Sequence, residues 1–528
     1  MLHPATSYDD LCESFAWDIP ARYNIGVDVC DKWAEIDHDR TAIIDLTDGT
    51  RTDVSFGVLQ YLSDHLAQHL QSNGIGVGDR VGVLRTQSVW TAAAHIAIWK
   101  LGAISVPLFT LFRAEALLSR LSNAGAKAVV VDESSVELVT PLRDQLPELQ
   151  HVICPETAKF DDDAEFTPHD TFADDPAILI YTSGTTGPPK GALHAHRVLP
   201  GHLPGVEMSH DFLPQAGDCM WTPADWAWIG GLLDVLMPAL HHGVPVVAAR
   251  MQKFSAAGCN DIIQKGGVRN IFFPPTALKM LMAEGVEISG LRTVACGGEP
   301  LGAALLNWGK SALGLSINEF YGQTECNMVI SSCGALYQSH DGCAGRPVPG
   351  HNVAVIDDQG QPTDAEGDIA VHRGTPVMML EYWQNRAATR EKFRGDWLLT
   401  GDRGILDQGY IRFVGRDDDV ITSAGYRIGP SAIENCLMGH AAVIGAAVIG
   451  KPDAKRTEIV KAYVKLQTGV AETADLVKEL QAHVADNLAA HEYPREIEFV
   501  TEFPMTVTGK IIRKELKARA SAEVPRSE

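Results

Sequence analysis

The segment 181-YTSGTTGPPKGALHAH-196 guides the interpretation of the whole chain, and it overlaps the end of an apolar run, 177-AILIYT-182, that predicts a central strand. Its glycines let backbone N–H groups approach an anion, its hydroxyl groups add donors, and Lys190 adds a positive charge. The segment therefore predicts a loop that binds nucleotide phosphates. A solvated turn is the weaker alternative, because turns rarely collect so many hydroxyl groups. The loop is not a P-loop, since Gly191 follows Lys190, and the dinucleotide pattern G-x-G-x-x-G is missing.

Helical and strand-like patterns alternate through the first 350 residues. The expected helices cover residues 56–74, 89–102, 276–285 and 301–314, and the expected strands cover 80–85, 127–132, 177–182, 269–273, 291–298 and 317–322. This alternation predicts mostly parallel sheets with helices on both faces. Two of the strands run directly into glycine-rich turns, which is where ligands bind in open α/β sheets.

The pattern changes after about residue 350. Antiparallel strands are expected at 352–357, 368–372 and 410–415, followed by a small unit with strands at 443–450 and 459–466 and a helix at 473–488. We therefore predict an α/β fold. A large N-terminal domain, residues 1–415, has βα-wound sheets and a small β-barrel-like subdomain. A small, mobile α+β C-terminal domain covers residues 416–528.

Composition narrows the classes of function. The 528 residues carry 44 basic and 67 acidic side chains, a formal charge of −23, which disfavours binding to nucleic acid or anionic lipid. The ten cysteines form no C-x-x-C pair, so neither a disulfide framework nor a zinc site is expected. His194 and His196 lack a nearby third ligand. No secretory signal or membrane-spanning run is visible, and a soluble, cytoplasmic protein is expected.

Six motifs in a fixed order resemble those of the adenylate-forming acyl-CoA synthetase superfamily. They are 182-TSGTTGPPKG-191, 297-GGEP-300, 321-YGQTE-325, 400-TGD-402, 415-GRDDDVITSAGYRIG-429 and 504-PMTVTGKIIRK-514. The family includes acyl- and aryl-CoA synthetases, adenylation domains of peptide synthetases and firefly-type luciferases. The motifs are most similar to those of short- and medium-chain acyl-CoA synthetases, so the resemblance implies ATP, Mg²⁺ and coenzyme A as the cofactor and co-substrates.

The resemblance also implies roles for individual residues. Lys510 would be the catalytic lysine that bridges the acid carboxylate and the α-phosphate, with Thr182, Lys190 and Glu325 completing the catalytic set. Glu325 would hold Mg²⁺. Contacts to ATP or AMP are implied for Thr182, Ser183, Gly184, Thr185, Thr186, Gly187, Lys190, Gly298, Glu299, Pro300, Tyr321, Gly322, Gln323, Thr324, Asp402, Arg416, Arg427 and Lys510.

Among these residues, Tyr321 would stack on adenine, Thr324 would bind the α-phosphate, and Asp402 would accept hydrogen bonds from both ribose hydroxyls. Residues 297–300 would form a wall of the adenine pocket. The alternative for that segment is a plain strand-to-helix turn, since Pro300 is well placed to start a helix.

Formation of the thioester implies rotation of the small domain. The resemblance puts the hinge at Asp418, the tunnel for coenzyme A at Ser423 and Gly425, and a phosphate contact at Arg427. The alternative for the acidic run 417–419 is a solvated surface, which we expect to hold for at least one of its residues.

The acyl pocket is expected around Trp226, Trp228, Gly230, Gly231 and Gly322, with residues near Ala295 contributing. Acetate-specific relatives carry tryptophan after the motif tyrosine, whereas this chain has Gly322, so a deeper pocket for acids larger than acetate is expected. For Trp226 an ordinary core position is an equally good interpretation.

Two other functions stay open at this level. A stand-alone adenylation enzyme could load a carrier protein, although no G-x-D-S attachment motif occurs in the tail, and a non-catalytic nucleotide sensor could use the same fold. The segment around Lys510 also resembles one that protein acetyltransferases modify in related synthetases. Acetylation there would remove the charge and abolish adenylation. The sequence does not indicate an oligomeric state.

Overall fold

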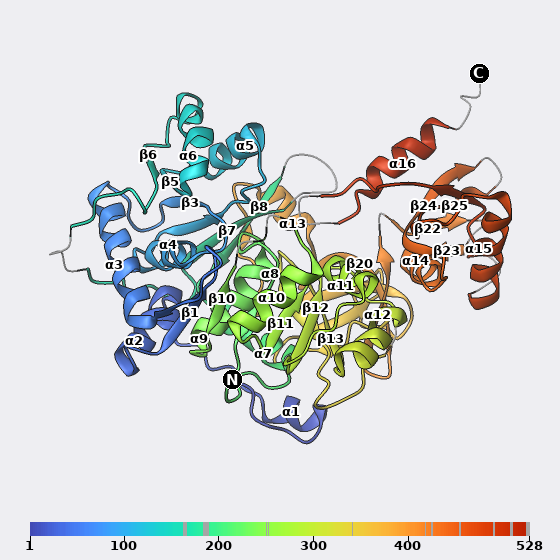
Figure 1. Ribbon diagram of the computed structural model, residues 1–528, viewed down its shortest axis with the longest axis horizontal. Helices are drawn as coiled ribbons and strands as arrows, with labels where there is room; N and C mark the ends of the chain where they lie inside the picture. The colour runs from blue at the N-terminus through green and yellow to red at the C-terminus, as the bar shows by residue number, and fades with distance from the viewer. Residues whose placement is uncertain are drawn as a thin grey trace.

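The computed structural model describes residues 1–161, 166–182, 189–249, 251, 253–340, 342–417, 419–423, 426–453, 456–488, 492–506 and 510–523 (Figure 1). Ser183–Gly187, Asp418 and Gly425, which belong to the predicted sites, lie outside these residues, as does the side chain of Arg427.

The first large sheet has seven strands in the order β18-β8-β7-β4-β3-β5-β6. Its bounds are β3 (Arg80–Leu84), β4 (Ile104–Pro107), β5 (Ala128–Val131), β6 (His151–Ile153), β7 (Pro176–Thr182), β8 (Lys190–Ala195) and β18 (Glu381–Tyr382). The pairs among β3, β4, β5, β6 and β7 are parallel, whereas β8 and β18 are antiparallel additions at one edge. The parallel strands are apolar almost throughout, as strands buried on both faces must be.

The second large sheet has nine strands in the order β15-β14-β13-β12-β11-β9-β10-β1-β2. Its bounds are β1 (Thr41–Asp45), β2 (Thr52–Ser55), β9 (Met220–Trp221), β10 (Val246–Ala248), β11 (Asn270–Phe273), β12 (Thr293–Gly297), β13 (Ile317–Gln323), β14 (Asn327–Ser331) and β15 (Arg346–Pro347). The six central strands are parallel, so the carboxyl ends of β12 and β13 meet at one edge.

Helices separate and cover these two sheets. They are α1 (Tyr8–Ser14), α2 (Lys32–Ile36), α3 (Phe56–Ser72), α4 (Val89–Lys100), α5 (Ala114–Ala124), α6 (Glu133–Val139), α7 (Val198–Ser209), α8 (Ile229–Gly231), α9 (Met237–His241), α10 (Ala256–Gly266), α11 (Pro275–Glu284) and α12 (Ala303–Trp308). One core joins α4, α7 and α9 to both sheets, so these helices lie between them, while α10, α11 and α12 share a second core with the nine-stranded sheet.

Two smaller antiparallel sheets follow. The first contains β16 (Val353–Ile356), β17 (Gly367–His372), β19 (Phe393–Arg394), β20 (Trp397–Asp407) and β21 (Tyr410–Arg416), and α13 (Arg386–Glu391) precedes β19. The second contains β22 (Ile421–Ser423), β23 (Tyr426–Ile428), β24 (Val443–Asp453), β25 (Thr457–Leu466) and β26 (Glu496–Phe499). With it pack α14 (Pro430–Met438), α15 (Ala474–Asn487) and α16 (Arg513–Ala522).

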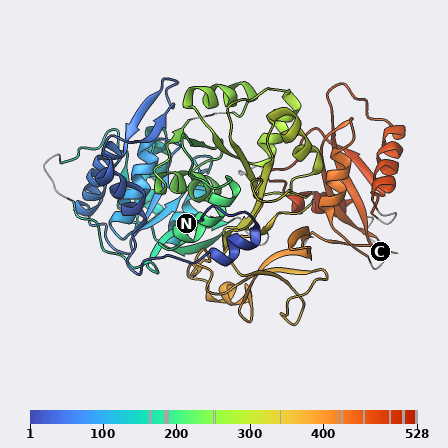
Figure 2. The same ribbon diagram turned by 90° about the horizontal axis from the view of Figure 1, so that it is seen from below.

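The unit formed by β22–β26 and its helices lies at one end of the molecule, beyond α12 and β20 (Figures 1 and 2). Its helix α14 approaches α12, and the side-chain oxygen of Asn435 lies 2.9 Å from the position that a Cβ on Gly302 would occupy. Pro430 lies against Gly415 of β21. The segment before α16 extends from this unit toward the large sheets (Figure 1).

The predicted α/β class, with a large N-terminal part and a small C-terminal part, is confirmed. The predicted strand 177–182 is β7, and the predicted strands 291–298 and 317–322 are β12 and β13. The helix expected at 301–314 begins later, at Ala303, and its last turn is the π-helical element η4 (Gly309–Leu313). Pro300 therefore ends a turn rather than starting the helix.

Candidate active site

The predicted phosphate loop connects β7 to β8, and the structure describes both of its ends. Thr182 and Lys190 are cross-strand partners, and the Thr182 hydroxyl donates to the carbonyl oxygen of Lys190 at 3.4 Å. The Lys190 ammonium lies 5.3 Å from the ring centroid of Tyr382, on the neighbouring strand β18. The ends of the loop are therefore held together at the edge of the seven-stranded sheet.

Gly298 follows directly after β12 and has a φ of +106°, which favours glycine. A Cβ at this position would lie 3.5 Å from the ring of Trp228 and 4.0 Å from Cε of Lys510. The turn 297–300 thus brings together the end of β12, the predicted acyl segment and the predicted catalytic lysine of the small C-terminal unit.

Tyr321 and Asp402 connect β13 with β20. The Tyr321 hydroxyl donates to Oδ2 of Asp402 at 2.5 Å, and Asp402 is only 6% exposed. Burial raises the pKa of the Asp402 carboxyl, while the nearby Arg416 guanidinium opposes that shift. Arg416 lies opposite Asp402 on β21, with 3.7 Å between Nη1 and Oδ1. The proposed ribose carboxylate therefore faces a tyrosine and an arginine at one edge of the small antiparallel sheet.

Gly322 and Gln323 continue β13 past Tyr321. The register between β13 and β14 shifts between Tyr321 and Gly322, and a Cβ on Gly322 would lie 1.6 Å from the carbonyl oxygen of Asn327. The Gln323 side-chain amide donates to the carbonyl of Thr400 at 2.9 Å. The backbone of this motif is therefore fixed by its antiparallel partner and by the β20 segment that carries Asp402.

Glu325 lies in the turn between β13 and β14 and is 8% exposed. Its carboxylate accepts a hydrogen bond from the hydroxyl of Tyr382, and this contact raises the pKa of Tyr382 together with the larger effect of burial. Sequence reasoning missed Tyr382, because it lies outside the six motifs and 57 positions from its partner. Its only signal is an aromatic residue in a short apolar run.

Lys510 reaches this site from the C-terminal unit. Burial lowers the pKa of Lys510, and the carboxylates of Glu299, Asp402 and Glu325 partly offset that effect, whereas Arg416 adds to it. The side chain nevertheless remains exposed to solvent. Residues associated with two different sheets thus surround one lysine.

Trp226 and Trp228 have different environments within the predicted acyl segment. Trp226 is fully buried and belongs to the core between the two large sheets. Trp228 is partly buried, with its ring centroid 5.5 Å from that of Phe272. Of the two, Trp228 is the one beside Gly298, whereas Trp226 has the ordinary core position.

The two glycines of this segment are closely surrounded. A Cβ on Gly230 would lie 2.9 Å from atoms of both Phe272 and Trp228, and a Cβ on Gly231 would lie 2.3 Å from the carbonyl oxygen of Asp225. The segment is therefore closely packed at both glycines, against aromatic rings at Gly230 and against backbone at Gly231.

Asp225 is a further residue of this segment that sequence reasoning did not single out. Its Oδ1 accepts from the N–H of Ala227 at 2.8 Å, and burial raises the pKa of Asp225 to about 6. The carboxylate of Asp132 adds to this shift.

The predicted hinge and coenzyme A tunnel are described only in part. Ser423 is buried at the end of β22 and pairs with Tyr426 of β23. Both sequence neighbours of Asp418 make contacts. Asp417 donates its N–H to the carbonyl of Gly401 at 2.9 Å, and the Asp419 carboxylate lies 3.0 Å from the Lys517 ammonium. Asp419 is therefore held by ion pairs, whereas Asp417 is exposed, as expected for at least one residue of the run 417–419.

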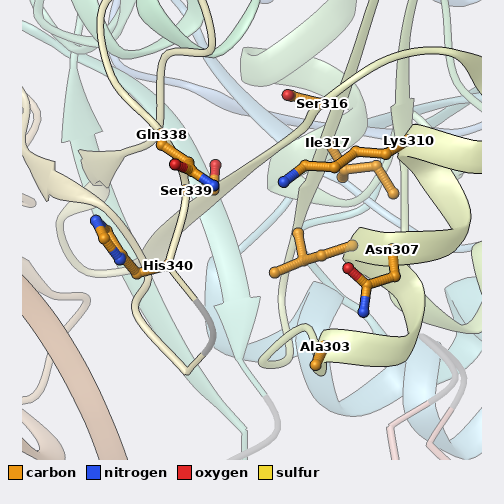
Figure 3. Close-up of a pocket in the computed structure, with 9 residues that line it drawn as sticks. Ala303, Asn307, Lys310, Ser316, Ile317, Gln338, Ser339 and His340 are labelled. Carbon is orange, nitrogen blue, oxygen red and sulfur yellow. The ribbon is translucent and has the colours of Figure 1, made fainter.

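A cavity of about 250 Å³ lies at the opposite end of β13, away from these residues (Figure 3). Ala303, Asn307, Lys310, Ser316, Ile317 and His340 are among the residues that line it. Because Ile317 begins β13 while Tyr321–Gln323 end it, the cavity is separate from the candidate active site.

Within the described residues, no group of three or more histidine, cysteine, aspartate or glutamate side chains is placed to hold a metal ion. A Mg²⁺ ion bound by Glu325 and by phosphate oxygens would need no such group, because this ion usually takes one or two carboxylates and completes its shell with phosphates and water. The buried, hydrogen-bonded Glu325 fits that role. None of the helices described here has the length and apolar character needed to cross a membrane.

Comparison with known proteins agrees with this geometry. The model of the AMP-binding enzyme family matches residues 30–383, and the model of the AMP-binding enzyme C-terminal domain matches residues 432–510. The chain is 33% identical to acetyl-coenzyme A synthetase of Bacillus subtilis, over 98% of this chain and 95% of that protein. It is 33% identical to the mitochondrial acyl-coenzyme A synthetase ACSM2B of Homo sapiens, over 95% and 91%. The anthranilate CoA ligase AuaEII, solved with anthranoyl-AMP, superimposes with a TM-score of 0.86 at 27% identity, covering 95% of this chain and 98% of that one.

Proposed function

The chain belongs to the AMP-binding enzyme family and is an AMP-forming acid–CoA ligase, and we propose that it acts on a short- to medium-chain carboxylic acid larger than acetate. The carboxylate would attack the α-phosphorus of ATP, forming acyl-AMP and releasing pyrophosphate. The thiol of coenzyme A would then attack the acyl carbon, releasing AMP and a proton. The observation that carries the proposal is the position of Lys510 beside Gly298, within the field of Glu299, Asp402 and Glu325.

The first step brings two anions together, so its barrier depends on fixed positive charge. Lys510 would lie between the acid carboxylate and the α-phosphate, while Lys190 would bind the outer phosphates that leave as pyrophosphate. Thr324, in the turn after β13, would donate to the α-phosphate. Glu325 would hold Mg²⁺, which supplies charge neutralisation at the phosphates, and Tyr382 orients that carboxylate by its hydrogen bond.

Asp402, Arg416 and Tyr321 would bind the nucleoside. Asp402 already accepts a hydrogen bond from Tyr321 and faces Arg416, so its carboxylate is held where both ribose hydroxyls could donate to it. The hydroxyl bond also fixes the ring of Tyr321, which we propose stacks on adenine. Gly298, Glu299 and Pro300 would form the opposite wall, where the positive φ of Gly298 turns the backbone.

The second step requires Lys510 to leave and the thiol to enter. We propose that the small unit rotates about Asp418 and brings Ser423, Gly425 and Arg427 toward the adenylate. Support comes from the division of the chain, because Arg416 ends β21 of one sheet and Ile421 begins β22 of another. The sheet that contains β21 and the sheet that contains β22 are thus joined in the chain by the short stretch between Arg416 and Ile421.

The acid would occupy the space between Trp228 and the turns at Gly298 and Gly322. Trp228 and Phe272 make this region aromatic and apolar, which favours a hydrocarbon or aryl acid over a charged one. No side chain projects from position 322, where acetate-specific relatives carry tryptophan. The tight packing at Gly230 limits depth in that direction, so we expect acids of moderate length rather than long chains.

A protein acetyltransferase could regulate the enzyme through Lys510. The side chain is exposed and thus accessible, and acetylation would remove the charge on which adenylation depends. A mass spectrum showing stoichiometric acetylation with undiminished adenylation would contradict this.

The test is an acid-panel assay with two readouts. Exchange of labelled pyrophosphate into ATP reports the first step, and coenzyme A-dependent AMP release reports both. We expect butyrate, hexanoate and benzoate to support exchange better than acetate, with Mg²⁺ required. Strong preference for acetate would overturn the size argument. Transfer to a carrier protein but not to free coenzyme A would favour the alternative acceptor.

A further inference from the structure

Thr506 and Lys510, the described residues on either side of positions 507–509, are joined by local hydrogen bonds. The N–H of Thr506 donates to the carbonyl of Lys510 at 2.7 Å, and the N–H of Lys510 donates to the Thr506 hydroxyl oxygen at 3.0 Å. Met505 and Ile511 form an isolated antiparallel bridge. Ile511 also packs against the apolar core formed by β24, β25 and α16, so the segment has an apolar attachment to the C-terminal unit.

Arg513, three residues after Lys510, adds a polar connection to the same unit. Its Nη2 lies 2.7 Å from both carboxylate oxygens of Glu434 on α14. Glu434 is only 8% exposed, and its Oε1 also accepts from the N–H of Val448 on β24 at 2.8 Å. One buried carboxylate therefore joins the start of α16 to α14 and to β24, a strand at the edge of the small sheet.

A second carboxylate joins the same helix to the proposed hinge. Nη1 of Arg513 lies 3.9 Å from Oδ2 of Asp419, and the Lys517 ammonium lies 3.0 Å from Oδ1. Asp419 is the residue directly after the proposed hinge residue Asp418. The first turns of α16 are thus held at the point where the C-terminal unit begins.

The charge of Arg513 responds to carboxylates on both sides of the boundary between the C-terminal unit and the large domain. Burial opposes its charge, but the carboxylates of Glu434 and Asp419, with a smaller contribution from Glu299, raise the pKa of Arg513 overall. Glu299 belongs to the turn beside which Lys510 lies. Arg513 and Lys510 are therefore both subject to the charge of Glu299.

We propose that Arg513 is a positioning residue for adenylation: through its bonds to Glu434 and its contact with Asp419 it holds the turn that delivers Lys510 to the site. Arg513 does not itself touch the reacting atoms. The inference rests on the proposed function, since it assigns Lys510 to the first step.

This role predicts a difference between the two half-reactions. Lys510 acts only in adenylation, so a misplaced turn slows pyrophosphate exchange and leaves thioester formation from ready-made acyl-AMP unchanged. A purely structural role would lower both, because a loosened C-terminal unit would also deliver the coenzyme A-binding residues poorly.

The experiment compares Arg513→Gln with Arg519→Gln in the full-length enzyme. Arg519 lies on the same helix and pairs with Glu498, but it is 57% exposed, so it is a matched control. Pyrophosphate exchange measures the first step, and AMP release from synthetic acyl-AMP and coenzyme A measures the second. We expect Arg513→Gln to lower exchange about 10- to 100-fold, the usual loss when a reacting group is displaced by about 1 Å. We expect the second step and the control to match wild type.

Two further variants keep the test decisive if Arg513→Gln folds poorly. Arg513→Lys keeps the charge but loses the fork that reaches both oxygens, so an intermediate loss confined to exchange is expected. Adding Arg513→Gln to Lys510→Ala should produce no further loss in exchange, because the two residues act as a unit.

Equal losses in both half-reactions, or wild-type exchange in Arg513→Gln and Arg513→Lys, would overturn the inference while leaving the proposed function in place. Absence of exchange in the wild-type enzyme with every acid would instead overturn the proposed function.

Discussion

Replacing Gly322 by alanine should damage the enzyme for every acid, although the change adds a single methyl group. On the present backbone the new Cβ would lie 1.6 Å from the carbonyl oxygen of Asn327, 2.5 Å from its carbonyl carbon and 3.1 Å from Cα of Met328. All three are backbone atoms, so no rotamer change can relieve the contact. The irregular pairing between β13 and β14 would have to open.

The magnitude follows from what this pairing holds. Forcing an extra methyl into well-packed structure costs about 1–3 kcal/mol, and a contact with fixed backbone lies at the upper end. Tyr321, Thr324 and Glu325 lie on either side of the bulge, so opening it by about 1 Å should lower pyrophosphate exchange about 100-fold. The loss should not depend on acid length.

Gly230→Ala is the matched comparison. Its Cβ would lie 2.9 Å from Phe272 and from Trp228, but these neighbours are side chains that can shift. We expect this variant to remain folded and to lose activity in proportion to acid size. The assay is kcat/KM for pyrophosphate exchange with acetate, butyrate, hexanoate and benzoate, together with thermal unfolding of each variant.

Two results for Gly322→Ala would refute this reasoning. Wild-type stability and exchange would show that the Asn327 carbonyl moves freely. A selective loss of the longer acids with unchanged stability would show that the new side chain enters the acyl pocket instead of meeting the backbone.

Three other predictions concern neighbouring and distant parts of the chain. Tyr382→Phe removes the hydrogen bond to Glu325 and should raise the Mg²⁺ concentration for half-maximal pyrophosphate exchange about 10-fold. Tyr410→Phe, which removes a hydrogen bond remote from the site, should leave that concentration unchanged. An unaltered Mg²⁺ requirement in Tyr382→Phe would show that Tyr382 does not orient Glu325. Lys100 is fully buried against Asp31 and Asp64, so Lys100→Ala should cost about 3–5 kcal/mol in urea unfolding, against less than about 1 kcal/mol for Lys265→Ala in the exposed pair with Asp261. Burial raises the pKa of Asp225 from 3.8 to about 6, so the folded state binds more protons than the unfolded state between these pH values and loses stability as pH rises. The stability of Asp225→Asn relative to wild type should therefore increase by about 3 kcal/mol between pH 4 and pH 7. A difference in stability that does not depend on pH would contradict the raised pKa.

The sequence predicted the elements that depend on local pattern. The strands β7 and β12 are continuous apolar runs ending in glycine-rich turns, and both were expected at nearly their observed bounds. Two-residue strands such as β9, β15 and β18 were not expected, because such short strands exist only through pairing with partners distant in sequence.

In the candidate site, too, the sequence predicts the residues of local motifs but not their contacts with distant partners. The motifs contain Asp402, Tyr321 and Glu325, but not the bonds that orient them. Asp402 meets Tyr321 across 81 positions, and Glu325 meets Tyr382 across 57. No local pattern encodes such a contact. The tight surroundings of Gly230 and Gly322 were also invisible, since a glycine in a sequence indicates space without showing what fills it.

The positive charges for adenylation are divided between two parts of the chain, and this division bears on the order of the steps. Lys190 lies on β8 and Arg416 ends β21, whereas Lys510 comes from the unit formed by β22–β26 and its helices. With a formal charge of −23 the protein repels ATP at long range, but salt screens such a field within about 10 Å, so only local cations decide binding at the site. In the proposed mechanism, the full local set would exist only while the C-terminal unit is docked. Changes at Arg513 or at the contact between Asn435 and Gly302 should therefore act on the first step alone, because thioester formation starts from an adenylate that has already lost its pyrophosphate charge.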